Sequence, residues 1–293
     1  NAVPAGKLVR CWLPYPRTDQ ARQRDVEFIF ASEPEYVFSP QECRHSTLYM
    51  EKRAVQGEPT VFSETFEYTS CGEWHNLRSE DVLPYDTTTA LYKEYTAERE
   101  KHIVFSPRLR ELAAKLTAGE TNPYLKAKRI FRWINDHFPW ASAREYSTIE
   151  NIPEYVLDNR HGDCGQVSLL FITLCRISGI PAHFQSGFMM HPRAWNLHDW
   201  AEVYFEGVGW VPVDQSFGIP AFARNADEEY FFLGGIDSWR MIVNTDYGMP
   251  LVPEKKYPRS ETVDFQRGEV EWEGGNLYFP QWSYHMDIDY LNY

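Results

Sequence analysis

The sequence has 293 residues, 43% of them hydrophobic and 16% aromatic, so it can bury a substantial core as one large domain or two smaller ones. Its formal net charge of −13 argues against phosphate backbones and anionic membrane surfaces, so we expect no nucleic-acid partner. No stretch approaches the ~18 apolar residues of a transmembrane helix, so we expect no membrane span. The chain begins at Asn1 rather than Met, which is compatible with removal of an export signal. We therefore favour a periplasmic or secreted location over a cytoplasmic one.

The five cysteines are Cys11, Cys43, Cys71, Cys164 and Cys175, and no two of them form a CxxC pair. This spacing argues against a zinc ribbon or a redox pair, and we expect neither a metal ion nor a cofactor. Because five is an odd number, at least one thiol stays free within a monomer. The first three could pair in an oxidising compartment, and their disulfide state is left open, as is the oligomeric state.

Residues 1–105 are expected to form a β-rich N-terminal module. Segments 7–13, 46–55 and 60–70 are rich in β-branched and aromatic residues, and turn-forming residues separate the last two. Several short strands with turns between them predict a sandwich-like arrangement. The pattern changes near residue 106, so we predict that residues 106–293 form a second domain.

Helical signals begin at the start of this second domain. Ser106 before Pro107, and Asn122 before Pro123, each place a capping residue ahead of a proline at the first helical position. A third, short helix is expected from Pro153. Apolar residues expected to face the core are Leu109, Leu112, Ala113 and Leu116 in the first helix, and Ala127, Ile130, Phe131 and Ile134 in the second.

The segment from residue 160 to 184 places Cys164 at the start of an apolar helix that Gly179 ends. The partial positive charge at a helix N-terminus favours a thiolate over a thiol, so a low thiol pKa is expected. Unpaired N–H groups of the first turn, Gly165 included, could hold a developing oxyanion. These features predict that Cys164 is a nucleophile. The core-facing positions of this helix are Val167, Leu170, Phe171 and Leu174.

A nucleophilic cysteine also needs a base and a group that orients the base. His198 opens the predicted strand 198–206, and Asp214 closes the next one, 209–218. In an antiparallel pair, the start of one strand lies near the end of its neighbour. The sequence therefore predicts His198 as general base and Asp214 as its orienting acid.

The register of this hairpin limits how closely the two side chains approach. A three-residue turn at 207–209 puts His198 and Asp214 on one face but four positions out of step. Pro212 cannot donate to a sheet ladder, so we expect a bulge or strong twist that closes the gap. Asp199 is expected on the opposite face of its strand, and we exclude it as the orienting acid.

The blocks "GDCGQVSLLFITLCRISGIPAHFQSGF" and "HDWAEVYFEGVGWVPVDQSFG" resemble the transglutaminase-like superfamily, from roughly Asn122 to Gly218. The resemblance implies an α+β fold with a papain-like core, preceded by a β-sandwich-like module and followed by additional C-terminal strands. It places the family's nucleophile on Cys164, its base on His198 and its acid on Asp214. The short spacing between the last two blocks is that of bacterial and archaeal members, which resemble cysteine peptidases and amidases at least as often as protein cross-linkers.

Other residues near the motif have two interpretations each. Trp140, Gly165 and His161 could line the substrate site or the oxyanion, but packing accounts for a tryptophan and a solvated loop for a histidine. Asp163 is expected to cap the helix or face away from the thiol. Glu202 shares the His198 face, where it could line the site or form a cross-strand ion pair.

Together these signals predict a cysteine-dependent enzyme that acts on a peptide or protein substrate through a thioester intermediate. Hydrolysis is preferred, because water is at about 55 M in any site that does not exclude it. A protein-glutamine transglutaminase, with an amine as acceptor, is the alternative that the same triad serves. A non-catalytic carbohydrate- or peptide-binding module on the same fold is a third hypothesis.

Overall fold

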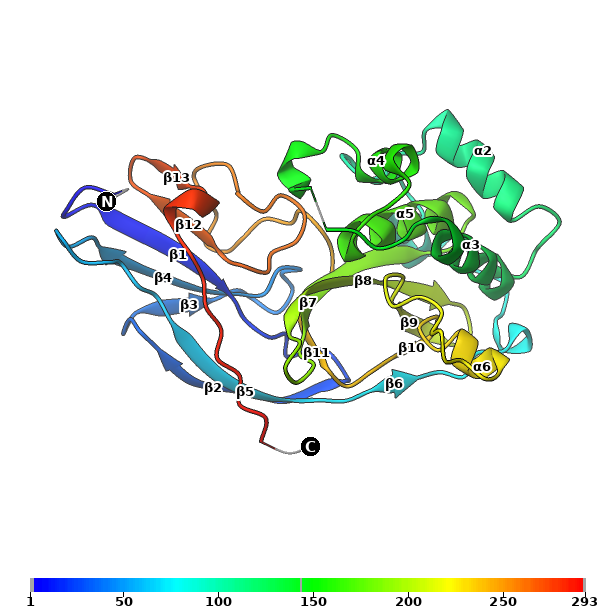
Figure 1. Ribbon diagram of the computed structural model, residues 1–293, viewed down its shortest axis with the longest axis horizontal. Helices are drawn as coiled ribbons and strands as arrows, with labels where there is room; N and C mark the ends of the chain where they lie inside the picture. Colours follow the sequence, from blue (N-terminus) through cyan, green and yellow to red (C-terminus); the bar gives the residue numbers. More distant parts are fainter. Residues whose placement is uncertain (1–2, 143, 292–293) are drawn as a thin grey trace. The chain divides into compact units, whose positions relative to one another are not determined.

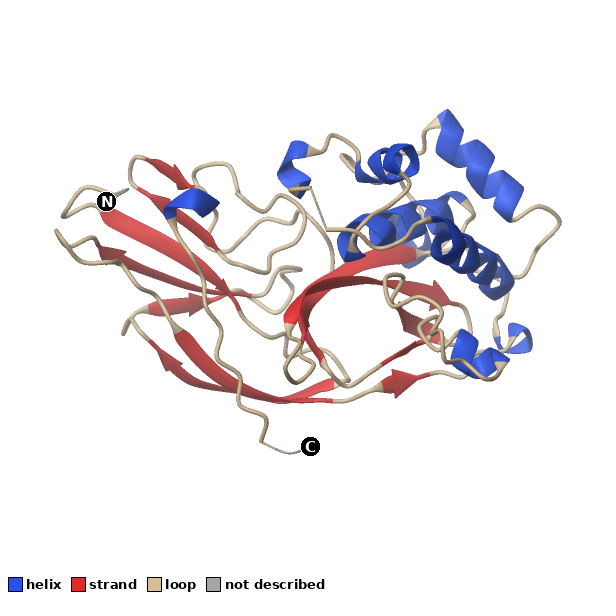
Figure 2. Ribbon diagram, in the orientation of Figure 1, coloured by secondary structure: helices blue, strands red, loops and turns tan. Residues whose placement is uncertain are grey.

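The computed structural model describes residues 3–142 and 144–291, and it combines six α-helices with several β-sheets in that described part (Figures 1 and 2). No helix among the described residues is long and apolar enough to cross a membrane. The helices are α1 (Ala90–Tyr95), α2 (Pro107–Leu116), α3 (Pro123–His137), α4 (Ile152–Asn159), α5 (Cys164–Ile177) and α6 (Ala226–Glu229). The strands are β1 (Leu8–Pro14), β2 (Gln23–Ala31), β3 (Tyr36–Phe38), β4 (Thr47–Arg53), β5 (Glu64–Ser70), β6 (Glu73–Trp74), β7 (Ala182–Met189), β8 (Asn196–Phe205), β9 (Gly209–Val213), β10 (Gly235–Ile236), β11 (Arg240–Asn244), β12 (Glu269–Trp272) and β13 (Gly275–Leu277).

The chain divides into two compact units. Unit 1 comprises Asn1–Cys71, Ser186–Leu197 and Trp239–Tyr293, and unit 2 comprises Gly72–Gln185 and His198–Ser238. The boundary passes through β7 and β8, which belong to a sheet with strand order β11-β7-β8-β9. The sequence-based division at residue 105 stays a prediction.

Unit 1 is built mainly of β-strands, as expected for the start of the chain. Its larger sheet has strand order β13-β12-β1-β4-β3, and a second sheet pairs β2 with β5. Leu48 and Met50 from the first sheet, together with Tyr15 directly after β1, pack against Phe28 and Phe66 from the second, as in a sandwich. The C-terminal strand β12 pairs antiparallel with β1, so the additional C-terminal strands complete the N-terminal sheet.

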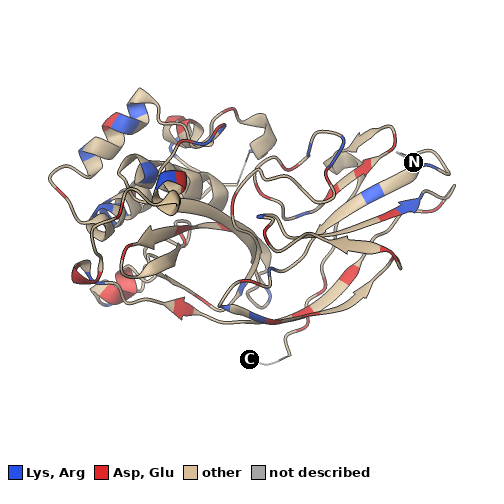
Figure 3. Ribbon diagram, turned by 180° about the vertical axis from the view of Figure 1, so that it is seen from behind, with Lys and Arg blue, Asp and Glu red and all other residues tan. Residues whose placement is uncertain are grey.

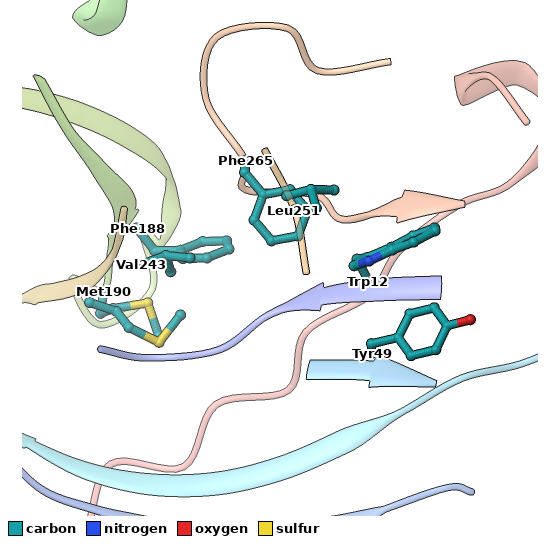
Figure 4. Packing of buried hydrophobic residues seen from close by; sticks show 8 residues of the cluster. Trp12, Tyr49, Phe188, Met190, Val243, Leu251 and Phe265 are labelled. Carbon is teal, nitrogen blue, oxygen red and sulfur yellow. The ribbon is translucent and has the colours of Figure 1, made fainter. Parts of the chain in front are cut away.

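The core of unit 1 is aromatic and draws on distant parts of the sequence (Figure 4). Trp12 from β1 contacts the ring of Tyr49 from β4 at a centroid distance of 5.0 Å. Phe188 and Phe265 come from β7 and from the segment before β12, and both are fully buried. Burying such rings together contributes more to stability than their area alone.

Unit 2 contains the helical part of the fold. The helix α5 contacts α2, α3 and α4, and Figure 1 shows these helices together on one side of β8 and β9. Ser106 and Asn122 cap α2 and α3 as expected, since their side chains accept hydrogen bonds from the N–H groups of Leu109 and Leu125. Figure 3 shows residues of both charge signs along α2.

The expected apolar stripe of α3 is confirmed, since Ala127, Ile130 and Phe131 are completely buried. In α5 every residue from 165 to 176 is buried, so the helix is enclosed on all sides and the expected one-sided packing is wrong. The helix α5 ends before Gly179, whose φ of 77° lies in the left-handed region that favours glycine. Short-range signals in the sequence thus predict where the helix that starts at Cys164 begins and ends.

A buried ion-pair cluster ties the C-terminal segment to the sheet of unit 1. Lys255 Nζ lies 3.4 Å from Glu269 and 3.6 Å from Glu271, and both carboxylates are completely buried. Without Lys255 the two buried carboxylates share one cation fewer and keep only longer contacts, of Glu271 with Arg10 at 3.6 Å and of Glu269 with Arg259 at 3.9 Å.

We therefore expect Lys255→Met to lower the free energy of unfolding by about 3–5 kcal/mol, measured by urea titration. The matched variant Lys7→Met removes a cation whose pair with Glu273 is half exposed, and it should cost less than about 1 kcal/mol. Equal effects of the two variants would contradict this account of the cluster.

Candidate active site

The N-terminus of α5 is held by a capping box. Asp163 Oδ1 accepts a hydrogen bond from the Gln166 N–H at 3.0 Å, and Gln166 Oε1 accepts one from the Asp163 N–H at 3.3 Å. This confirms the expectation that Asp163 caps the helix. Cys164 is the first helical residue, and it is half-buried.

The thiol of Cys164 is paired with Asp199. Its Sγ lies 3.5 Å from Asp199 Oδ2, which accepts the thiol hydrogen bond. Asp199 directly follows His198 in β8, so the sulfur lies against the segment of strand that carries the predicted base. Contact between Cys164 and His198 themselves stays a prediction.

The environment of the sulfur differs from that expected for a helix N-terminus. Burial raises the pKa of the Cys164 thiol well above its ordinary value, and the negative charges of Asp199 and Asp163 raise it further. A backbone hydrogen bond from Asp199 acts in the opposite direction without cancelling them. The low thiol pKa predicted from the sequence is therefore wrong for this structure, because burial and neighbouring carboxylates outweigh the helix dipole.

His198 and Asp214 form a direct, buried pair. The distance between His198 Nε2 and Asp214 Oδ2 is 2.7 Å, and the two residues are 5% and 0% exposed. The remaining oxygen, Oδ1, accepts hydrogen bonds from the N–H groups of Ser216 at 3.2 Å and Phe217 at 3.1 Å. The carboxylate is therefore fixed by backbone on one side and orients the imidazole on the other.

The hairpin register explains how this pair forms. Phe205 pairs with Gly209 and Ala201 with Val213, so the three-residue connection is 206–208 rather than 207–209. Extending this register by one residue leaves His198 and Asp214 only two positions out of step. Diagonal neighbours of this kind are about 7–8 Å apart at Cα, which side chains can span. The four-position gap calculated from the sequence is wrong, and the pairs of β8 with β9 run in uninterrupted register without the expected bulge.

Glu202 lies four residues after His198 in β8, and its carboxylate contacts a side chain of the neighbouring strand. Its Oε2 is 3.1 Å from His183 Nε2 on the neighbouring strand β7. It also accepts a hydrogen bond from Gln185 at 3.2 Å. Of the two interpretations of Glu202, the structure supports the cross-strand pairing, with His183 as the partner.

The other predicted site residues lie around the start of α5. Trp140 forms an isolated parallel bridge with Gly162, two residues before Cys164, and its side chain is 61% exposed. His161 packs edge-on against Tyr155, with ring centroids 6.5 Å apart. Gly165 is buried at the second position of α5. Roles for these residues in binding substrate or oxyanion stay predictions.

Two residues next to the thiol were not predicted as parts of the site. Tyr146 donates a hydrogen bond to Asp163 Oδ1 at 2.6 Å and contacts Asp199 Oδ2 at 3.4 Å. It lies in the short 3₁₀ turn Tyr146–Thr148, which has no periodic signal in the sequence. Strand alternation points Asp199 away from His198 and excludes it as the orienting acid, yet its Oδ2 lies 3.5 Å from the Cys164 sulfur.

Comparison with known proteins places this site in a family context. Residues 110–215 match the model of the family described as the transglutaminase-like superfamily. The uncharacterized protein YebA of Bacillus subtilis is 26% identical over 140 residues, which are 41% of this chain and 19% of YebA. A protein-glutamine gamma-glutamyltransferase of Pseudomonas aeruginosa is 23% identical over 125 residues, 39% of this chain and 19% of that protein. The matches thus span about a fifth of the length of both relatives.

A solved structure confirms the fold class over nearly the whole chain. The crystal structure of a candidate cysteine protease from Cytophaga hutchinsonii superposes with a TM-score of 0.56 at 18% sequence identity. The likeness covers 99% of this chain and 90% of that one. At this level of identity the likeness shows the fold alone.

The carboxyl of Asp163 provides a test of the electrostatics near the thiol. Burial raises its pKa to about 6, although hydrogen bonds from Tyr146 and Gln166 oppose the increase. The folded protein then binds a proton more tightly than the unfolded chain, so this carboxyl stabilises the fold at low pH. The contribution is lost as the pH rises from about 4, the ordinary aspartate pKa, through about 6.

We therefore expect Asp163→Asn, which keeps a capping side chain, to gain stability relative to the wild type between pH 4 and pH 7. The gain should approach about 3 kcal/mol, the free-energy equivalent of a difference of about two in pKa. Urea unfolding at several pH values measures it. A variant that loses relative stability over this range would contradict the raised pKa.

Proposed function

Residues 110–215 belong to the transglutaminase-like superfamily, and from this premise we propose that the chain catalyses cysteine-dependent acyl transfer on amide or peptide bonds. The observation that carries the proposal is the buried 2.7 Å pair of His198 Nε2 with Asp214 Oδ2. His198 lies on β8, and the next residue of that strand, Asp199, contacts the Cys164 thiol. Thioester chemistry requires an imidazole oriented by an acid and within reach of a thiol, and this pair provides the oriented imidazole.

The proposed roles follow from the hydrogen bonds of the imidazole. With the proton on Nε2 directed at Asp214, the basic nitrogen of His198 is Nδ1. Nδ1 takes the Cys164 proton as Sγ bonds to the substrate carbonyl carbon, and the carbonyl oxygen becomes an oxyanion. N–H groups of the first turn of α5 stabilise that oxyanion. His198 then gives its proton to the leaving amine, and a thioester on Cys164 remains.

Because the pKa of the Cys164 thiol is raised, His198 has a larger role in the reaction. A thiol that stays protonated before substrate binds has to lose its proton during attack, so the imidazole acts as a general base instead of stabilising a preformed thiolate. Asp214 supports this step because its negative charge stabilises the imidazolium that forms. The triad therefore works as a unit, with each member acting on the next.

The molecule that accepts the acyl group from the thioester determines which reaction the enzyme catalyses. Attack on the thioester by water gives a peptidase or amidase, and we favour this outcome because water is at about 55 M where a site is accessible. Attack by a primary amine gives a transglutaminase, the activity in the name of the Pseudomonas relative. The third hypothesis, a carbohydrate- or peptide-binding module without catalysis, is disfavoured by the retained pair of His198 and Asp214.

The test is a peptide library incubated with the protein, with and without a primary amine, and analysed by mass spectrometry. We expect cleaved or deamidated products in water and an acyl adduct on the Cys164 peptide after rapid quenching. Cys164→Ser should abolish both, and Asp214→Asn should lower kcat/KM by about 10²–10⁴-fold, since it removes the acid that orients the base.

Cys43→Ser is the matched control, because Cys43 is a partly exposed thiol of unit 1 outside the proposed site. It should retain full activity. Amine adducts that dominate over hydrolysis products would establish the transglutaminase alternative. Binding of peptide with no product and no adduct would support the non-catalytic module instead.

A further inference from the structure

The carboxylate that contacts the proposed nucleophile belongs to a cluster of two carboxylates and a phenol. Asp199 Oδ2 accepts the thiol hydrogen bond at 3.5 Å, and the Tyr146 hydroxyl lies 3.4 Å from the same oxygen. That hydroxyl donates to Asp163 Oδ1 at 2.6 Å. Tyr146, Asp163 and Asp199 are 6%, 8% and 2% exposed, so this cluster is withdrawn from solvent. We call these three residues the acidic bracket.

Gly165, which has no side chain, leaves the space that the acidic bracket occupies. A Cβ added to Gly165 would lie 2.4 Å from the Tyr146 hydroxyl and 2.6 Å from Asp199 Oδ2. Any other residue there would displace one of these groups, since real Cβ atoms do not approach so closely. The glycine after Cys164 thus permits the bracket to contact the thiol.

We propose that Asp199 is a positioning residue whose carboxylate holds the Cys164 thiol in its protonated form in the resting protein, with Tyr146 and Asp163 holding that carboxylate in place. The inference deepens the proposed function, because it takes Cys164 to be the nucleophile. It adds a second acidic group with a role opposite to that of Asp214. Asp214 prepares the base, whereas Asp199 delays loss of the thiol proton until a substrate engages His198.

The hydrogen bonds of Tyr146 explain why Asp199 can accept a hydrogen bond from the thiol. A phenol has one proton, and here it lies closer to Asp163, at 2.6 Å, than to Asp199, at 3.4 Å. The phenol therefore compensates the charge of Asp163 more than that of Asp199. An anion this close to sulfur disfavours a second negative charge on the thiol.

The charged groups that act on the thiol come from several elements. Asp199 belongs to β8, Asp163 precedes α5, and Asp214 follows β9; all three raise the pKa of Cys164, after the larger effect of burial. Glu145, beside the 3₁₀ turn, acts on Asp163 in the same direction. In the proposed mechanism, His198 becomes a cation only when it takes the thiol proton during attack.

The test is alkylation of wild-type protein by iodoacetamide as a function of pH, followed at the Cys164 peptide by mass spectrometry. We expect the wild-type midpoint above about 8.5, the ordinary cysteine pKa. Asp199→Asn keeps the shape and removes the charge, so its midpoint should fall by about one to three pH units. Asp163→Asn should lower the midpoint by less, because Asp163 is the smaller of the two contributions.

The chain contains its own controls. Cys43 and Cys71 are partly exposed thiols of unit 1, and their profiles should be the same in every variant. Cys175 is completely buried, so its protection reports that a variant is folded. Asp158→Asn removes an exposed carboxylate of α4 and should leave the Cys164 midpoint unchanged.

A wild-type midpoint at or below about 8.5, or an unchanged midpoint in Asp199→Asn, overturns the inference. If Cys175 becomes alkylated in Asp199→Asn, that variant is not folded. The alkylation midpoints of Cys164 in the wild type and in Asp163→Asn then test the inference. Alkylation needs no substrate, so a shifted midpoint in a protein without acyl transfer would contradict only the proposed function. Acyl transfer with an unshifted midpoint would contradict only the role of Asp199.

Discussion

The hydrogen bond between His198 and Asp214 is the interaction on which the rest of the site depends. Asp214 is completely buried, and the backbone of the following turn satisfies one of its oxygens, so its other oxygen has a fixed direction. The imidazole, held by that oxygen, presents a single orientation to its surroundings. A buried carboxylate without such a partner would be strongly unfavourable, so the pair couples stability of the hairpin to the geometry of the site.

Much of this arrangement could be predicted from the sequence because it depends on local patterns. The caps Ser106 and Asn122 and the glycine that ends α5 follow from short-range rules, and the structure confirms them. The one-sided apolar stripe predicted for α5 is wrong, because the neighbouring elements enclose this helix on all faces. Strand β2 has no clear alternation in its exposed residues and was not predicted. The pairing of β12 with β1 joins residues from opposite ends of the chain, and no short-range signal carries such a contact.

The errors at the site also have physical explanations. The sequence predicts the hairpin turn one residue too late. Moving a turn by one residue shifts the pairing of the two strands by two positions, so the predicted separation of His198 from Asp214 is too large. The pKa of Cys164 was predicted from the helix dipole alone. That effect is modest, whereas burial and the carboxylates of Asp199 and Asp163 act at short range. Tyr146 could not be found, since its role arises only from tertiary contacts.

The central claim is that the sulfur of Cys164 and the imidazole of His198 meet in one site. A crystal structure of the protein with a peptide-based electrophile attached covalently to Cys164 tests it most directly. The account predicts a bond from Sγ to the inhibitor, with Nδ1 of His198 turned toward the reacting atoms and Nε2 still on Asp214. An adduct in which the His198 ring lies out of reach of residue 164, with its Asp214 hydrogen bond intact, would contradict it.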